Sequence, residues 1–394
     1  MTEKTPLFDK VPEESRKILN TFDLILQDVK PLNSKQQAML PQNIRNLSHL
    51  LTDDRNARRI GYMNETVSLS AYAHYFLWWN LVRLTPLFAG LAKNADSKPF
   101  FDSVQDGDVF LDIGSGPLTV PIALWLAAPA LRQKEITFYC LDYSQTALSF
   151  GEELLLSIMS KTHSATPDQK IWKIIRVKGS IGTKINRKAK LVTCANMFNE
   201  LFWNSSEPLE QTSKKYASVI LGYACKDAAV FVAEPGIPRA ARFISLLKDS
   251  LMRKKFLPLS PCPHFGQCPM DGRKGGKWCH FVLLTDDAPE KLLKISAAAG
   301  IPKDRASLSF VFSASEQYVQ NAEMQKDLPL RIVSDSIRLY DGSSARYACS
   351  AKGLTLAIAP EGDYSSGDFV RVKGEDIKKL PVDRKSGAVK ITLK

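Results

Sequence analysis

The chain of 394 residues has no long hydrophobic run. Its most apolar segment, Val120–Leu131, is interrupted by Pro121 and Pro129 and is shorter than the ~20 residues that span a bilayer. The first residues include acids and have no apolar core, so they match neither a secretory signal nor a transit peptide. The sequence also has no internal repeat and no low-complexity segment. These absences predict a globular protein without a membrane anchor in the cytoplasm, most simply of a bacterium.

Cysteine is scarce, with seven in the chain, and it is unevenly distributed. Cys262, Cys268 and Cys279 fall in the stretch Pro261–Phe281, which also holds three prolines and two histidines. This composition disfavours helix and strand and predicts a rigid loop that directs its thiols to one point. Because cytosolic thiols stay reduced, a metal or catalytic role is favoured over disulfides. The alternative is three unrelated buried thiols, since free cysteine often packs as a small apolar residue.

The spacing of these thiols indicates the kind of metal site. Five and ten residues separate them, whereas structural zinc usually takes closely paired cysteines. Irregular spacing is commoner in iron–sulfur proteins, whose clusters take four thiolates. A 4Fe-4S cluster is therefore predicted, with zinc as the second choice. The fourth ligand must lie elsewhere in the chain, and Cys349 is the candidate, with His264 or His280 as alternatives.

Positive charge exceeds negative charge, with 53 basic and 41 acidic residues and a net charge of +12. A surplus of this kind favours a polyanionic partner, most simply RNA, over a membrane surface. The densest run, 169–190, has eight basic residues and no acid, although such runs often mark only a solvated face. The tail adds a second basic region, which consists of Arg371, Lys373, Lys378, Lys379, Arg384, Lys385, Lys390 and Lys394.

The chain divides into three regions by its hydrophobic pattern. Residues 1–100 are predicted to form an N-terminal helical region, because apolar residues from Ile18 to Val29 repeat at helical spacing. The aromatic-rich segment 66–84 is expected to be a helix that packs in the core. Residues 329–394 are predicted to form a small β subdomain, since short strand-like runs alternate with Gly-containing turns.

Strands alternate with helices in the middle region, 101–328, which includes the cysteine loop at 258–281. This alternation predicts an α/β domain with a parallel, doubly wound sheet that ends in an antiparallel pair. The strands are expected near 109, 136–142, 172–177, 191–195, 229–233, 278–285 and 308–313.

A candidate nucleotide site lies between the first two of these strands. The segment Asp112–Pro117 reads Asp-Ile-Gly-Ser-Gly-Pro and opens a helix, and its glycines let a ligand approach the backbone. Asp142 ends the second strand, where an acid is placed to bind ribose hydroxyls. A nicotinamide-binding domain is disfavoured, because Thr119 stands where its fingerprint requires a third glycine.

No catalytic residue is predicted. The segment after the fourth strand reads Ala-Asn-Met-Phe-Asn-Glu-Leu at 195–201 and lacks the Asn/Asp-Pro-Pro-Tyr/Phe motif of exocyclic-amine methylases. A cytosine methylase needs a nucleophilic cysteine, but Cys194 lies within a strand and Cys262 within the metal-like loop. Side chains after the fourth strand could contact cofactor or substrate, or cap a helix instead; they are Asn196, Asn199 and Glu200.

The glycine turn and the acid of the second strand resemble class I S-adenosylmethionine (SAM)-dependent methyltransferases over roughly 109–313. With Asn-Met-Phe-Asn-Glu-Leu at 196–201, Ala-Glu-Pro-Gly at 233–236 and the cysteine motif, they resemble methyltransferase-like assembly factors of the small ribosomal subunit. That family is known in mitochondria and has bacterial relatives. The resemblance implies a SAM site at Asp112, Gly114, Ser115, Gly116, Asp142 and Asn196. It also implies a 4Fe-4S cluster on Cys262, Cys268, Cys279 and Cys349.

The resemblance further implies that the protein binds small-subunit ribosomal RNA (rRNA) and assists assembly of that subunit and translation. One alternative is an active SAM-dependent rRNA methyltransferase, with iron–sulfur or with zinc. A radical-SAM or redox enzyme is disfavoured, because the chain has no Cys-x3-Cys-x2-Cys motif. The protein is expected to be a monomer.

Overall fold

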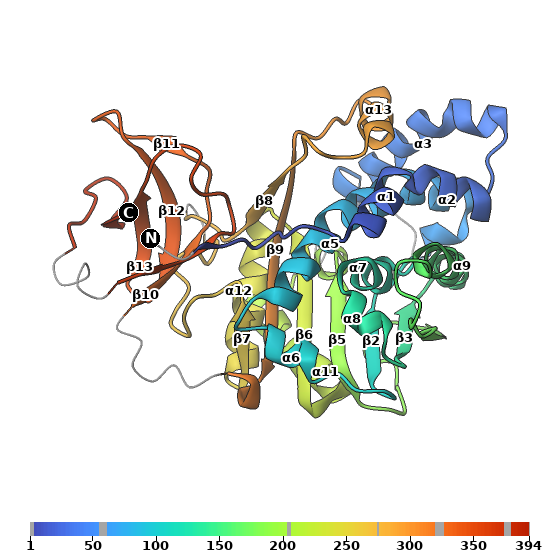
Figure 1. Cartoon of the computed structure of the whole chain (residues 1–394), viewed down its shortest axis with the longest axis horizontal. Helices are drawn as coiled ribbons and strands as arrows, with labels where there is room; N and C mark the ends of the chain where they lie inside the picture. The colour runs from blue at the N-terminus through green and yellow to red at the C-terminus, as the bar shows by residue number, and fades with distance from the viewer. Residues whose placement is uncertain are drawn as a thin grey trace.

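The computed structural model describes residues 4–54, 61–202, 206–273, 276–319, 327–373 and 380–393. These residues form a large sheet with helices on both faces and a smaller sheet beside it (Figure 1). In the described part of the chain, every helix is too short or too polar to cross a membrane. Three basic residues of the tail lie outside the described residues, namely Lys378, Lys379 and Lys394.

The large sheet has the strand order β4-β3-β2-β5-β6-β9-β7, and β8 also pairs with β9. Strands β2 to β6 pair in parallel, whereas β9 is antiparallel to its neighbours β6, β7 and β8. This is the order of the class I SAM-dependent methyltransferase sheet, so the predicted fold class is confirmed. The strands are β2 (Val109–Ile113), β3 (Thr137–Asp142), β4 (Lys173–Lys178), β5 (Ala189–Ala195), β6 (Ala224–Pro235), β7 (Phe256–Ser260), β8 (Phe281–Leu284) and β9 (Arg305–Ser315).

Helices cover both faces of this sheet. One face packs against α5 (Trp78–Lys93), α7 (Thr119–Ala127) and α9 (Gln145–Thr162), whose buried side chains share a core with the N-terminal helices. The other face packs against α11 (Leu209–Tyr223) and α12 (Pro238–Met252). Every residue of β2 and α7 is buried, which explains why their sequences are apolar without alternation. Four shorter helices complete this part of the fold: α6 (Lys98–Asp102), α8 (Pro129–Arg132), α10 (Phe198–Leu201) and α13 (Glu290–Ala298).

The N-terminal region is a series of helices, of which the third begins at a side-chain cap. A capping box between Asn33 and Gln36 starts the third helix. The single helix expected around Ile18 is two helices, because the chain breaks at Thr21. The aromatic segment is continuous helix with a π-helical part, and its Trp78 and Trp79 are buried, as expected. The elements are α1 (Glu13–Asn20), α2 (Phe22–Val29), α3 (Ser34–Thr52), η2 (Tyr62–Asn64), α4 (Thr66–Ala71) and η3 (Tyr72–Leu77).

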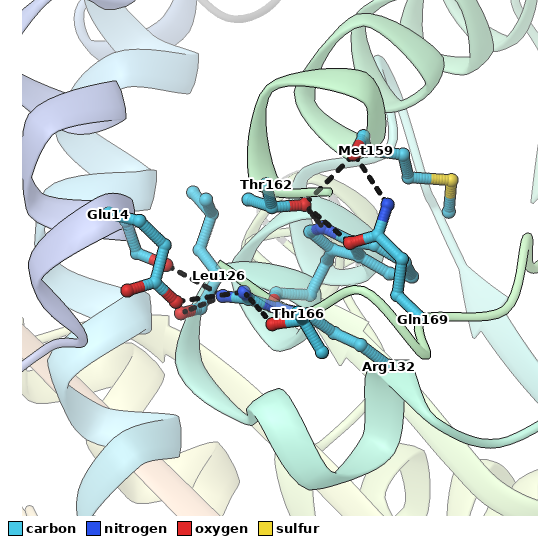
Figure 2. Close-up of polar contacts among 9 residues, drawn as sticks. Glu14, Leu126, Arg132, Met159, Thr162, Thr166 and Gln169 are labelled. Atoms are coloured by element: carbon cyan, nitrogen blue, oxygen red, sulfur yellow. Dashed lines mark hydrogen bonds and ion pairs between the residues drawn. The ribbon is translucent and has the colours of Figure 1, made fainter. Parts of the chain in front are cut away.

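A buried arginine joins the first helix to the large sheet's helices (Figure 2). The side chain of Arg132 is fully buried and pairs with Glu14 at 2.9 Å. Its guanidinium also donates to Ser15 Oγ at 2.8 Å and to the Trp125 carbonyl at 2.7 Å. Since a buried guanidinium is costly unless its donors are satisfied, these contacts fix the helical region against α7 and α8.

The smaller sheet has the order β1-β14-β10-β12-β13-β15, with β11 on β12, and its own apolar core. The N-terminal strand β1 belongs to the smaller sheet, where it pairs with β14. The chain then crosses from this sheet to α1 (Figure 1). The prediction of helix throughout 1–100 is wrong at this strand, and β15 was not expected either. The strands are β1 (Lys4–Thr5), β10 (Leu328–Ile332), β11 (Ile337–Arg338), β12 (Ser344–Ser350), β13 (Gly353–Ile358), β14 (Phe369–Val372) and β15 (Val389–Thr392); η4 (Glu316–Tyr318) follows the large sheet.

Candidate functional site

The glycine turn follows β2 at the edge where the parallel strands end. Gly114 and Gly116 have φ of 70° and 51°, in the left-handed region that favours glycine. The N–H groups of Gly114 and Ser115 donate to the Leu141 carbonyl at 2.8 and 3.1 Å, which fixes the turn against β3. A Cβ atom on Gly114 would lie 2.9 Å from the Met197 Cβ, so no larger residue fits there.

Asp142 reaches this turn from the end of β3. Its Oδ2 accepts a hydrogen bond from the Gly116 N–H, and its Oδ1 accepts one from the Ser144 N–H, both at 2.8 Å. Ser144 caps α9, and its hydroxyl donates to Asn64 Oδ1 at 2.8 Å. Burial raises the pKa of Asp142. The structure therefore brings the glycine turn and the acid of the second strand together, although they are 26 residues apart.

Asp112 lies within β2 and is buried. Its carboxyl accepts hydrogen bonds from Ser115 Oγ at 2.5 Å and Thr193 Oγ1 at 2.6 Å. Burial raises the pKa of Asp112 to about 7, although both hydroxyls act in the opposite direction. The carboxyl ties β2, β5 and the turn to one another, so it acts on the turn through Ser115.

Asn196 directly follows β5 and has a φ of 59°. Its N–H donates to the Ala233 carbonyl at 2.8 Å, and its Oδ1 accepts from Arg83 Nη2 at 2.9 Å. The same guanidinium donates to Asn80 Oδ1 at 2.7 Å and to the Ser307 carbonyl at 2.8 Å. Arg83 thereby joins α5, the end of β5 and β9 at one point.

Arg83 and Lys303 are cations of this edge that the sequence analysis missed. Arg83 Nε is buried and has no hydrogen-bond partner, and burial lowers the pKa of Arg83 to about 10. The Lys303 ammonium lies over the rings of Tyr75 and Trp79, at 5.2 and 5.6 Å from their centroids. Burial and the nearby Arg83 lower the pKa of Lys303 to about 8. One signal was available, because Arg83 is the only Asp, Glu, Lys or Arg of the segment 66–92.

Glu234 closes the same edge at the end of β6. Its carboxyl oxygens accept from the N–H groups of Phe198 and Asn199 at 2.8 and 3.0 Å. Burial raises the pKa of Glu234 to about 8. The backbone of Asn199 therefore has a structural role. The charge of Glu200 acts on Tyr72, because burial and Glu200 both raise the pKa of Tyr72.

The cysteine loop joins β7 to β8 and faces the smaller sheet. Cys262, Cys268 and Cys279 lie in this loop, and Cys349 lies in β12, paired in register with Arg331. Burial raises the pKa of all four thiols, to about 11 for Cys262, and neighbouring thiols raise the pKa of Cys262, Cys279 and Cys349 further. The structure therefore brings the four predicted thiols into one neighbourhood.

The four thiols lie in one region, but the described residues do not arrange them around a single metal ion. Among the described residues, no group of three or more His, Cys, Asp or Glu side chains is arranged to hold a metal ion. His264 Nε2 lies 3.1 Å from Cys349 Sγ, so this histidine contacts the candidate fourth ligand. His280 Nδ1 lies 3.2 Å from the Trp278 carbonyl, within the loop.

Two buried cations face the thiols. Lys248 of α12 has a side chain that is 3% exposed, and its charge lowers the pKa of Cys262. Arg331 of β10 also lowers the pKa of Cys262. Arg331 holds the loop to the smaller sheet, because it donates to the carbonyls of Pro261 at 2.8 Å and Gly367 at 2.7 Å. Both charges favour the thiolate form, which is the form that binds metals.

The basic run 169–190 is only partly a surface feature. Lys173 and Lys178 are exposed on β4, the edge strand, where lysine blocks pairing with other chains. Lys190 is buried instead, where it pairs with Asp227 and donates to Tyr318. This run therefore has a structural explanation for some of its charges.

The sequence matches the family described as mitochondrial small ribosomal subunit Rsm22 over residues 85–332. The matched span includes the glycine turn, Asp142, Asn196 and the cysteine loop, whereas Cys349 lies beyond it. No curated protein matches the sequence.

Solved methyltransferase structures are similar at low identity. The plantazolicin methyltransferase BpumL, in complex with SAH, is 10% identical and covers 71% of this chain and 98% of its own, with a TM-score of 0.30. A precorrin-6y methyltransferase from Geobacter metallireducens is 12% identical, with 56% and 86% covered and a TM-score of 0.30. A geranyl diphosphate methyltransferase is 9% identical, with 55% and 74% covered and a TM-score of 0.28. These similarities carry no argument about activity.

Proposed function

The chain belongs to the mitochondrial small ribosomal subunit Rsm22 family, and we propose that it binds small-subunit rRNA and assists small-subunit assembly and translation. The observation that carries this proposal is the family match over 85–332, which runs from α5 to the end of β10. The net charge of +12 supports a polyanionic partner. A cytoplasmic location and a monomeric state stay predictions from the sequence.

The glycine turn is proposed to hold SAM, which would supply a transferable methyl group. Gly114 and Gly116 have positive φ values, and the carboxylate of Asp142 lies beside them. This arrangement suits the close approach of a nucleoside. Met63 adds an adaptable apolar contact, because its Cε lies 3.6 Å from where a Gly116 Cβ would be. The residues proposed for this site are Asp112, Gly114, Ser115, Gly116, Asp142 and Asn196.

The four thiols are proposed to hold a 4Fe-4S cluster, with zinc as the alternative. A 4Fe-4S cluster together with its four thiolate ligands has a net charge of about −2, which the buried cations Lys248 and Arg331 would offset. Thiolates are also the ligands that such clusters take. The donor chemistry therefore fits, although the described arrangement does not itself gather three donors around one ion. The group would tie the smaller sheet to the cysteine loop, as Arg331 already does.

Metal analysis of anaerobically purified protein tests the cluster. Brown protein that absorbs near ~400 nm and contains iron would support it, whereas colourless protein with one zinc would favour zinc. Cys349→Ser should lose metal if Cys349 is a ligand, and His264→Ala, which alters its neighbour, should keep it. The opposite pattern would replace Cys349 by His264 as the fourth ligand.

Binding of purified small subunits or their rRNA tests the function. Wild-type protein that shows no affinity for either would overturn the proposal. Asp142→Ala should weaken SAM binding and leave rRNA binding in place, and unchanged SAM affinity would count against the proposed pocket.

An active rRNA methyltransferase is the second candidate. It is favoured by one observation, which is the group of Arg83, Asn196 and Lys303 at the edge where an acceptor would lie. Transfer of labelled methyl groups from SAM to small subunits would establish this activity. Absence of transfer with intact SAM binding would leave the assembly role without catalysis.

A further inference from the structure

A cavity of 540 Å³ lies between α11, α12 and the cysteine loop. Lys214 of α11 and Arg253 at the end of α12 line it from the helices. Phe265 and Gln267 line it from the loop, between the first two of its cysteines. None of the residues proposed to hold SAM lines this cavity, so it is a second site. Its volume is in the range of pockets that hold small ligands or part of a larger one.

The unpaired charged side chains that line this cavity are positive. Lys214 and Arg253 are exposed, and their side chains make no hydrogen bond or ion pair with a described residue. The carboxylates that line the cavity are already paired, Glu210 with Arg242 and Asp249 with Lys248. The two exposed cations are therefore available to an anionic partner, and phosphate groups are partners of that kind.

Phe265 adds an aromatic platform beside these cations. It is one of the few large apolar side chains that the described surface exposes, at 43%. The prolines on either side of the loop's first cysteine stiffen the backbone that carries it. An exposed aromatic ring next to unpaired cations is the combination by which proteins bind single strands, since bases stack on the ring and phosphates meet the cations.

We propose that this cavity binds a short single-stranded segment of RNA, with a base stacked on Phe265 and phosphates at Lys214 and Arg253. The proposal rests on the function proposed above and assigns one of its contact surfaces. An acidic protein segment would meet the same cations, but it would not need the exposed ring. RNA is therefore the partner that explains all three side chains.

Binding of a fluorescently labelled, single-stranded RNA of ~12 nucleotides to the full-length protein tests the proposal. Phe265→Ala should weaken binding about 5- to 100-fold, whereas Phe265→Trp should retain it. Leu24→Ala is the matched control, because Leu24 is also exposed, at 52%, but lies on α2. Melting temperatures of all variants should stay at the wild-type value.

The cations have a separate signature in the salt dependence. Combining Lys214→Gln with Arg253→Gln should lower the slope of log affinity against log salt by about 1.4, at ~0.7 for each phosphate contact. The control pair, Lys17→Gln with Lys35→Gln, changes exposed lysines of α1 and α3 and should leave the slope unchanged.

Each result of these binding experiments supports or overturns RNA binding at the cavity. If wild-type protein binds RNA and the cavity variants bind equally well, this surface is not the site, while the proposed function stands. If wild-type protein does not bind the single-stranded RNA, the proposal for this cavity fails, whereas the proposed function fails only if small subunits and their rRNA are not bound either. If an acidic peptide competes and the charge variants lose affinity but Phe265→Ala does not, the partner is a protein segment and the RNA proposal is overturned.

Discussion

Replacement of Asp112 by asparagine is expected to remove a pH dependence of stability. The carboxyl of Asp112 is buried, and its folded-state pKa of about 7 lies well above the usual value of 3.8. Between these two pH values the folded protein holds a proton that the unfolded chain has released. Stability therefore falls as pH rises through this window and is constant above it. Asparagine keeps the shape and can exchange hydrogen bonds with the hydroxyls of Ser115 and Thr193.

The size of the effect follows from the shift in pKa. A difference of about 3 pH units corresponds to about 4 kcal/mol over the whole window, at ~1.36 kcal/mol per unit. From pH 5 to pH 7, wild-type protein should lose about 2 kcal/mol relative to Asp112→Asn. For a domain of this size, the melting temperatures of wild-type protein and Asp112→Asn should therefore move ~4–8 °C relative to each other between pH 5 and pH 7.

Thermal unfolding followed by tryptophan fluorescence at pH 5, 6, 7 and 8 measures this separation. Every other titrating group contributes to both proteins, so the difference between the two profiles isolates Asp112. Parallel profiles would refute the reasoning, because they would mean that the folded protein does not hold this proton. Glu234→Gln provides an independent case, with the window extended to about pH 8.

Gly151→Ala should destabilise the protein by about 1–3 kcal/mol or more, because the added Cβ would lie 2.4 Å from the Pro117 backbone. Gly222→Ala should be neutral or stabilising by up to ~1 kcal/mol, because its added Cβ would meet nothing within 4 Å. Urea denaturation compares the two. Arg132→Met should cost about 3–5 kcal/mol in the same assay, because it leaves buried partners unpaired (Figure 2). Lys303→Met should instead stabilise the protein by about 1–2 kcal/mol at pH 7, since the folded-state pKa of Lys303 is lowered to about 8; the gain should vanish as pH rises to ~10.5, where the unfolded lysine also loses its charge.

Most of the large sheet could be predicted from the sequence, because its central strands are buried on both faces. β2 and β5 are short apolar runs between helical segments, and such runs have few alternatives. The meeting of the glycine turn with Asp142 was also predictable, since neighbouring parallel strands end at the same edge of a sheet.

The elements that were missed depend on distant contacts. β1 has only two residues and becomes a strand because β14 offers it an edge. The break at Thr21 carries neither proline nor glycine, so nothing local marks it. The four thiols were predicted as a group, whereas the two cations that face them come from helices and strands with no sequence link to the loop.

Buried cations are the feature that connects the candidate sites of this molecule. Lys303 and Arg83 stand at the edge of the glycine-turn site, and Lys248 and Arg331 stand at the thiols. Stability alone would favour apolar side chains at such positions, because burial of a charge is costly. Conflicts of this kind concentrate where function requires them. Variants such as Lys303→Met should therefore separate the two requirements, with higher stability and weaker binding of SAM or rRNA. Higher stability with unchanged binding would mean that this cation serves neither ligand.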